Sequence, residues 1–265
     1  MSELQAVHGL SLLLGVSLLV QTFEFFRIQN EMTGEGVWAW SVLKKELPQN
    51  SPSVNRLFDF LFQEKIHLIH LCARLLGALL LIAVGSSLWL MLFLFLSHVS
   101  LLFRFRGAFN GGSDFLSLLV ITGLLLAHLC HLIDPMALGY KAGLWYITLH
   151  TISSYFVSGW VKFKRREWRD GSALVMFLDG GIYGPLSANS FFRLKPVGML
   201  CSWSFMAWEG LAPFLLLSSD LAMVYCLIAA CFHFLVFWFF GLNRFFWAWC
   251  ASFPALIYCS GRLPI

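Results

Sequence analysis

Charged residues are scarce in this chain. Asp, Glu, Lys and Arg together make up 12% of its 265 residues, against roughly 25% in soluble domains. So few charges could not cover a water-soluble globule with polar surface, which excludes an ordinary soluble domain. The formal net charge of +4 is also modest, and we expect no nucleic-acid partner.

Paired cysteines and cleavage signals are lacking as well. The seven cysteines lie inside apolar runs with no Cys-x-x-Cys pair, so neither a disulfide framework nor a zinc ribbon is expected. The start of the chain carries Glu3 and no nearby Lys or Arg. We therefore expect no cleavable signal peptide, and the first apolar run should remain in the mature protein. No Pro- or Ser-rich linker divides the chain, which predicts one domain over residues 1–265.

Apolar residues fill the sequence in long runs. Hydrophobic residues account for 59% and aromatic residues for 17% of the chain, and several runs reach the roughly 18 to 20 residues that a helix needs to cross hydrocarbon. We predict an all-α, polytopic membrane helical bundle with about eight transmembrane helices in a lipid bilayer. The predicted spans are residues 7–26, 66–84, 86–103, 114–133, 142–161, 196–218, 221–241 and 245–261.

Two longer connections interrupt these runs. Residues 28–65 mix Trp and Phe with paired charges, which favours an interfacial helix or an ordered loop. Residues 163–195 begin with a basic stretch and continue through a Gly-rich sequence, which indicates a surface or re-entrant loop. Of the 18 Lys and Arg residues, 15 follow the first, third, fifth or seventh predicted span. The positive-inside rule then predicts that both termini lie outside.

Histidines occur at helical spacing within the predicted spans. His67, His70 and Arg74 lie at i, i+3 and i+7, so they share one helical face. His128 and His131 repeat the His-x-x-His spacing in another span. Two such pairs could bind a metal or ligate haem, because imidazole suits Fe, Cu and Zn. Hydrogen bonding between helices, proton transfer and substrate binding are the alternatives.

Further ionisable residues lie alone in apolar runs. Such groups cost roughly 2.5 to 3.5 kcal/mol at the centre of a membrane helix, so each raises a functional question. Glu209 needs a partner, for which Arg74, His233 or a helix amino terminus would serve. It is either half of a structural ion pair or a proton acceptor. His98, His150 and His233 are candidates of the same kind.

Residues 158–174, SGWVKFKRREWRDGSAL, place a lysine at the end of an apolar run with Trp and Gly close behind. This pattern resembles the fifth-helix signature of the vitamin K-dependent gamma-carboxylase superfamily, whose compact bacterial members are called HTTM proteins. An Asn-led opening from Asn110, WEGLAPFLLL around Glu209 and an FH-led final block around His233 are similar to further blocks of that family. The resemblance covers roughly residues 110–259.

The resemblance implies a membrane enzyme of a bacterial cell membrane, with Lys162 as the base that deprotonates a quinol. It implies further that Glu209 and His233 take part in catalysis, and that His150, Arg74, Asn110 and Trp168 contact the substrate. From the residues alone, a dehydrated Lys162 supplies a neutral amine, while a snorkelling Lys162 only marks the membrane edge.

The substrate is then a quinol, a lipid or a membrane-delivered peptide, with a quinone as the candidate cofactor. A non-catalytic subunit or peptide maturation factor of a membrane complex is the alternative, because a shared fold does not fix function. Other membrane subunits or a peptide would be its partners. A small transporter fits less well, since the sequence has no evident inverted repeat.

Overall fold

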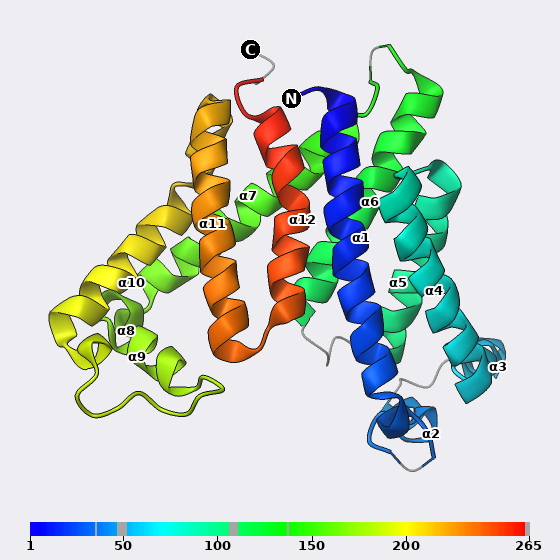
Figure 1. Ribbon diagram of the computed structural model, residues 1–265, viewed down its shortest axis with the longest axis horizontal. Helices are drawn as coiled ribbons and strands as arrows, with labels where there is room; N and C mark the ends of the chain where they lie inside the picture. Colours follow the sequence, from blue (N-terminus) through cyan, green and yellow to red (C-terminus); the bar gives the residue numbers. More distant parts are fainter. Residues whose placement is uncertain (35, 47–51, 106–110, 137, 263–265) are drawn as a thin grey trace.

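The computed structural model describes residues 1–34, 36–46, 52–105, 111–136 and 138–262. Within these ranges the chain forms helices, turns and short connections and contains no strand (Figure 1). The predicted all-α class is confirmed.

A long helix occupies each predicted apolar run. A short 3-10 helix, η4 (Ala212–Leu217), follows helix α10, and the two helices together cover the sixth run. The long helices are α1 (Glu3–Arg27), α4 (Glu64–Val84), α5 (Leu88–Phe105), α6 (Gly111–Ile133), α7 (Lys141–Lys164), α10 (Lys195–Gly210), α11 (Ser219–Phe240) and α12 (Asn243–Cys259).

Five of these helices, α1, α4, α5, α6 and α11, are long and apolar enough to cross a membrane. Helices α10 and α12 have only 16 and 17 residues, and α7 is less apolar because polar residues such as His150 and Ser153 interrupt its middle. The chain is therefore an all-helical integral membrane protein with five helices that meet both conditions for spanning.

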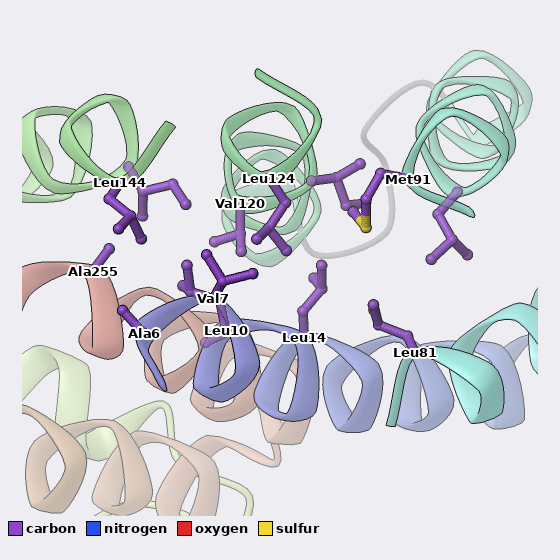
Figure 2. Close-up of a cluster of buried hydrophobic side chains, with 14 of the residues drawn as sticks. Ala6, Val7, Leu10, Leu14, Leu81, Met91, Val120, Leu124, Leu144 and Ala255 are labelled. Atoms are coloured by element: carbon purple, nitrogen blue, oxygen red, sulfur yellow. The ribbon is translucent and has the colours of Figure 1, made fainter. Parts of the chain in front are cut away.

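Helix α1 lies at the centre of the bundle, between α12 and α4 (Figure 1). Its leucines at i, i+4 and i+8 are fully buried and face α6, so that Leu10 and Leu14 lie opposite Val120 and Leu124 (Figure 2). This leucine spacing places one stripe of α1 against its neighbours. Because α1 has partners on several sides, it anchors the larger of the two main cores.

Helix α12 belongs to both cores. Ala251 and Ala255 pack in the core around α1, whereas Phe253 and Leu256 pack in a second core with α7, η4 and α11. Because Ala251 and Ala255 are small, the face of α12 that carries them can approach α1 closely. The two cores are therefore joined through one helix.

The close crossing of α6 and α7 depends on paired glycines. A Cβ atom added at Gly143 would lie 2.1 Å from the carbonyl oxygen of Gly123 and 2.5 Å from the Cβ of Ala127. No side chain fits in that space, so the two backbones meet directly, as small residues allow in membrane bundles.

The outer faces of the helices are apolar. Leu76 on α4 and Val224 and Leu227 on α11 are among many large hydrophobic side chains with more than half of their surface exposed. A water-soluble protein rarely exposes so much contiguous apolar surface. These faces are suited to contact lipid.

The two connecting segments also contain ordered helices. In the described parts of residues 28–65 these are η1 (Gln29–Met32), α2 (Trp40–Leu43), η2 (Lys44–Glu46) and α3 (Pro52–Leu61). Arg104 of α5 donates hydrogen bonds to the carbonyl oxygens of Phe62 (3.2 Å) and Trp38 (3.4 Å), which holds the first segment against the bundle. Residues 163–195 contain α8 (Arg166–Arg169), α9 (Ser172–Asp179) and η3 (Phe191–Arg193).

The start of the chain and the end of α12 lie at the same end of the bundle (Figure 1). The Arg262 guanidinium donates a hydrogen bond of 3.0 Å to the carbonyl oxygen of Met1. The number of membrane crossings and the side on which these ends lie stay predictions.

Candidate functional site

Lys162 and Glu209 form an ion pair between α7 and α10. The Lys162 ammonium lies 2.7 Å from Glu209 Oε2 and 2.8 Å from Oε1, and it donates a third hydrogen bond of 2.6 Å to Ser158 Oγ. Ser158 in turn donates to Glu209 Oε1 at 3.2 Å. All three donor positions of the ammonium are therefore used, and the carboxylate has two donors.

The local sequence explains why these groups meet. Ser158 and Lys162 are four residues apart on α7, so they lie one turn apart on the same face. Between them, a Cβ atom added at Gly159 would lie 2.9 Å from the amide nitrogen of Gly210 and 3.0 Å from the Cβ of Glu209. The absence of a side chain at Gly159 lets α10 approach until the carboxylate reaches the lysine.

Two aromatic rings flank the ammonium. Lys162 Nζ lies 4.9 Å from the ring centroid of Phe205 and 5.4 Å from that of Trp168, within the range of cation–π attraction. The Lys162 side chain retains 17% of its exposure and the Glu209 side chain 6%. Trp168, a predicted substrate contact, therefore lies beside Lys162, and the lysine keeps limited access to its surroundings.

His233 lies deeper, beside Tyr155. The Tyr155 hydroxyl and His233 Nε2 are 2.7 Å apart, and the histidine ring stacks on Trp249 with centroids 4.8 Å apart. Tyr155 also contacts Trp208, which packs on Phe205. Aromatic contacts therefore connect His233 to the lysine site, while its hydrogen bond goes to Tyr155.

Several buried polar atoms of this aromatic cluster have no hydrogen-bond partner in the described parts of the chain. They are Trp208 Nε1, Tyr225 Oη, His233 Nδ1 and Trp249 Nε1. A buried polar group without a partner costs about 1 to 3 kcal/mol. The region next to Glu209 therefore retains unused donors and acceptors that a polar ligand could satisfy.

Arg74 belongs to a different set of residues, near α1 and α5. It is fully buried, and its guanidinium contacts Gln21 Oε1 (2.5 Å), His98 Nδ1 (2.9 Å) and Ser97 Oγ (3.1 Å). The predicted role of Arg74 beside Lys162 has no supporting contact, because its partners are on α1 and α5 rather than α7 or α10. Glu209 likewise pairs with Lys162 instead of Arg74 or His233.

Asp114, at the start of α6, is the centre of this second set. Its carboxylate accepts a hydrogen bond from Gln21 (2.6 Å) and one from Arg244 of α12, and its carbonyl oxygen contacts His98 Nε2 at 2.8 Å. Arg244 also lies 3.4 Å from Glu24. We call the buried residues Gln21, Arg74, His98, Asp114 and Arg244 the Asp114 network.

The remaining predicted substrate contacts are not gathered at Lys162. His150 is exposed on α7 and packs on Tyr146; its twelve-residue separation from Lys162 corresponds to about 18 Å along the helix. Asn110 lies outside the described residues.

The two His-x-x-His pairs lie far apart. His67 and His70 are near the start of α4, whereas His128 and His131 are on α6, where His128 lies beside the end of α4. His70 bonds to Ser97 near the start of α4, whereas His128 bonds to Ser86 just after its end. The 14 residues of helix from His70 to Val84 alone span about 21 Å, so the pairs do not form one site. Among the described residues, no group of three His, Cys, Asp or Glu side chains could hold a metal ion. His67 and His131, the other members of the two pairs, therefore also lie in separate parts of the bundle.

Sequence reasoning singled out Arg74 and His98 but missed Gln21, Asp114 and Arg244 of the Asp114 network, and it missed Tyr155. Asp114 and Arg244 stand at the edges of apolar runs, where charge is ordinarily taken to mark the membrane boundary, so their burial gave no separate signal. Tyr155 had no signal, since a tyrosine in an aromatic-rich run does not stand out.

Comparison with known proteins identifies no family, since no protein-family model, curated protein or solved structure matches this chain.

Proposed function

We propose that this protein is a membrane enzyme of the vitamin K-dependent gamma-carboxylase-like type, in which Lys162 serves as the base. The supporting observation is the Lys162–Glu209 pair, held by Ser158 between two aromatic rings with 17% of the lysine side chain exposed. The substrate would be a quinol, a lipid or a membrane-delivered peptide that reaches the lysine from its exposed side.

A paired lysine can act as a base if its partner takes the proton first. Transfer of a proton from the Lys162 ammonium to the Glu209 carboxylate leaves a neutral amine and a neutral acid. Where water is excluded, this neutral pair is less disfavoured than it is in water. The amine then accepts a proton from an acidic group of the substrate, and the restored ammonium stabilises the negative charge that forms.

The residues present suit a quinol. Lys162 and Glu209 would hold a hydroxyl group, Trp168 and Phe205 would contact a ring, and the unpartnered Trp208 and Tyr225 atoms provide further hydrogen-bonding capacity. A bound quinol would supply the acidic hydroxyl for this site. His233 would act through Tyr155, which is its hydrogen-bond partner.

The proposal includes eight membrane crossings. Helices α7, α10 with η4, and α12 pack along α1, α6 and α11, and they correspond to apolar runs in the sequence. With all eight long helices crossing, both termini lie outside a bacterial cell membrane. The segments 28–65 and 163–195, which hold four and six Lys or Arg residues, then lie at its inner surface, the second as a surface or re-entrant loop.

The test uses full-length protein in lipid nanodiscs and a soluble naphthoquinol, whose ultraviolet spectrum shifts when its hydroxyl proton is lost. With protein in excess over naphthoquinol, we expect the ligand bound to the wild type to show the spectrum of its anion at a lower pH than free naphthoquinol, and Lys162→Met to abolish this difference, because the ammonium that receives the proton also stabilises the anion. Lys164→Met, in which an exposed lysine two residues away is replaced, should behave like the wild type. Ionisation of bound naphthoquinol at the same pH in Lys162→Met and the wild type would refute the proposal.

The second candidate is a non-catalytic subunit or peptide maturation factor. Large apolar side chains exposed on the segment 163–195, among them Phe177, Tyr183 and Phe191, favour a surface that contacts another molecule. Co-purification of a stoichiometric protein partner, retained equally by the wild type and Lys162→Met, would support this candidate.

A further inference from the structure

A groove of about 460 Å³ lies at the junction of α9 and the start of α10. Residues from both helices and the connection before α10 line it: Asp170, Val175, Met176, Arg193, Leu194 and Lys195. Its volume lies in the range of small-molecule sites, roughly 300 to 1,000 Å³.

Two glycines form one wall of the groove. Gly171 has a φ of +82°, and a Cβ atom added there would lie 2.4 Å from the amide nitrogen of Met199 and 2.5 Å from the carbonyl carbon of Gly198. Glycine is therefore required at position 171 for both its conformation and its close contact. This backbone contact fixes the start of α9 against α10, so the packing of these two helices sets the shape of the groove.

Most charges in and around the groove are compensated by neighbours. Arg193 donates to the Asp179 carboxylate at 2.7 Å and 3.2 Å and to two carbonyl oxygens. Asp170 accepts two hydrogen bonds from Ser172, which together hold the pKa of its carboxyl below its usual value, and Arg166 lies 3.9 Å away.

Lys195 is the exception. Its side chain is exposed and forms no ion pair with a described carboxylate, and its charge acts only at longer range, where it contributes to lowering the pKa of Asp170. Residues 163–195 together contain six basic and three acidic residues. The groove therefore offers a cation to an anionic ligand, within a segment whose total charge also attracts anions.

Apolar surface continues from the groove. Met176 and Leu194 line it and are more than half exposed, and Phe177 and Phe191 are exposed nearby. Basic residues beside exposed aromatic and aliphatic side chains are typical of segments that lie in the headgroup region of an anionic membrane. A free anion in water would make no use of this apolar surface.

We propose that this groove binds the headgroup of an anionic phospholipid from the protein's own bilayer. The phosphate faces Lys195, and the glycerol and first acyl carbons lie on Met176 and Leu194. This site is separate from the Lys162–Glu209 pair and does not depend on the chemistry of Lys162. The two are nevertheless adjacent, because Phe177 of α9 packs on Trp168, with centroids 5.6 Å apart, and Trp168 lies over the Lys162 ammonium.

The experiment measures retained phosphatidylglycerol by native mass spectrometry after full-length protein is extracted from vesicles of phosphatidylcholine and phosphatidylglycerol. We expect Lys195→Gln to lower retention roughly fivefold, which corresponds to about 1 kcal/mol for one basic residue near a membrane surface. Arg165→Gln is the matched control, since it removes one charge from an exposed residue of the same segment that does not line the groove.

Met176→Ser separates a lipid from free phosphate. It should lower phosphatidylglycerol retention because it removes an apolar contact, whereas a site for inorganic phosphate would be unaffected. Equal losses for Lys195→Gln and Arg165→Gln would show only general attraction to the membrane and would overturn the proposal. Displacement of the lipid by excess inorganic phosphate, with no effect of Met176→Ser, would overturn it as well.

Discussion

The Asp114 network and the Lys162–Glu209 pair are both polar sites in an apolar bundle, and they differ in how their charges are enclosed. Asp114, Arg74 and Arg244 are each at most 4% exposed, and their contacts join α1, α4, α5, α6 and α12. The pair joins only α7 and α10, and its lysine is 17% exposed.

This difference separates a structural role from a chemical one. A buried charge with several fixed partners on different helices cannot change its protonation or position without disturbing all of them. A two-residue pair with access on one side can exchange a proton or meet a ligand. The Asp114 network is therefore suited to stabilise the bundle, and the pair is suited to the chemistry proposed for it above.

The largest expected effect comes from breaking the Asp114 network. Asp114→Asn leaves Arg74 and Arg244 buried near a neutral side chain, and loss of one partner of a buried ion pair costs about 3 to 5 kcal/mol. Thermal unfolding in detergent should show a clear fall in the midpoint. Asp220→Asn makes the same chemical change at an exposed position of α11 and should leave the midpoint nearly unchanged. Similar midpoints for both variants would contradict the structural assignment.

A smaller and asymmetric effect is expected at the Lys162–Glu209 pair. Lys162→Met leaves a carboxylate that is 6% exposed without its cation, which should cost about 2 kcal/mol. Glu209→Gln should cost less, because the long lysine side chain can move its ammonium toward the headgroups.

The double variant Lys162→Met/Glu209→Leu removes both charges. It should be more stable than Lys162→Met, with a coupling energy of about 0.5 to 3 kcal/mol between the two sites. Strictly additive losses in a double-mutant cycle of unfolding free energies would mean that the pair contributes no interaction.

The smallest effect concerns Asp59 of α3, outside the spanning helices. A hydrogen bond of 2.7 Å from Trp40 Nε1 lowers the pKa of Asp59 below 3.8, and Lys44 lies 3.3 Å from the same carboxylate. Since the folded-state pKa is lowered, the stabilisation is present above pH 3.8 and is lost as the pH falls through the folded-state pKa.

Hydrogen exchange followed by mass spectrometry can measure this local effect. Protection of the amides in α2 should fall on acidification in the wild type, while Asp59→Asn should show low protection at both pH values. If α2 in Asp59→Asn had the same protection as in the wild type at both pH values, the contact between α2 and α3 would have no role in holding α2.

The long helices could be predicted from the sequence because each apolar run is about as long as a membrane span. The partners of the polar residues could not. Lys162 and Glu209 are 47 residues apart, and Asp114 and Arg244 are 130 apart, and such pairings depend on which helices pack side by side. Helical spacing correctly placed His67, His70 and Arg74 on one face, but the neighbours of that face come from α1 and α5. Gly159 illustrates the limit, since its importance is evident only once α10 lies against it.

The position of α12 between the two cores has a consequence for biosynthesis. Membrane helices are inserted in the order in which the ribosome makes them, so α1, α4, α5 and α6 enter the bilayer well before α12. Until Arg244 arrives, Asp114 lacks its closest cationic partner, and the faces of α1 and α11 that α12 will cover remain open to lipid. We therefore expect the two cores to close together only when α12, the last helix, is inserted.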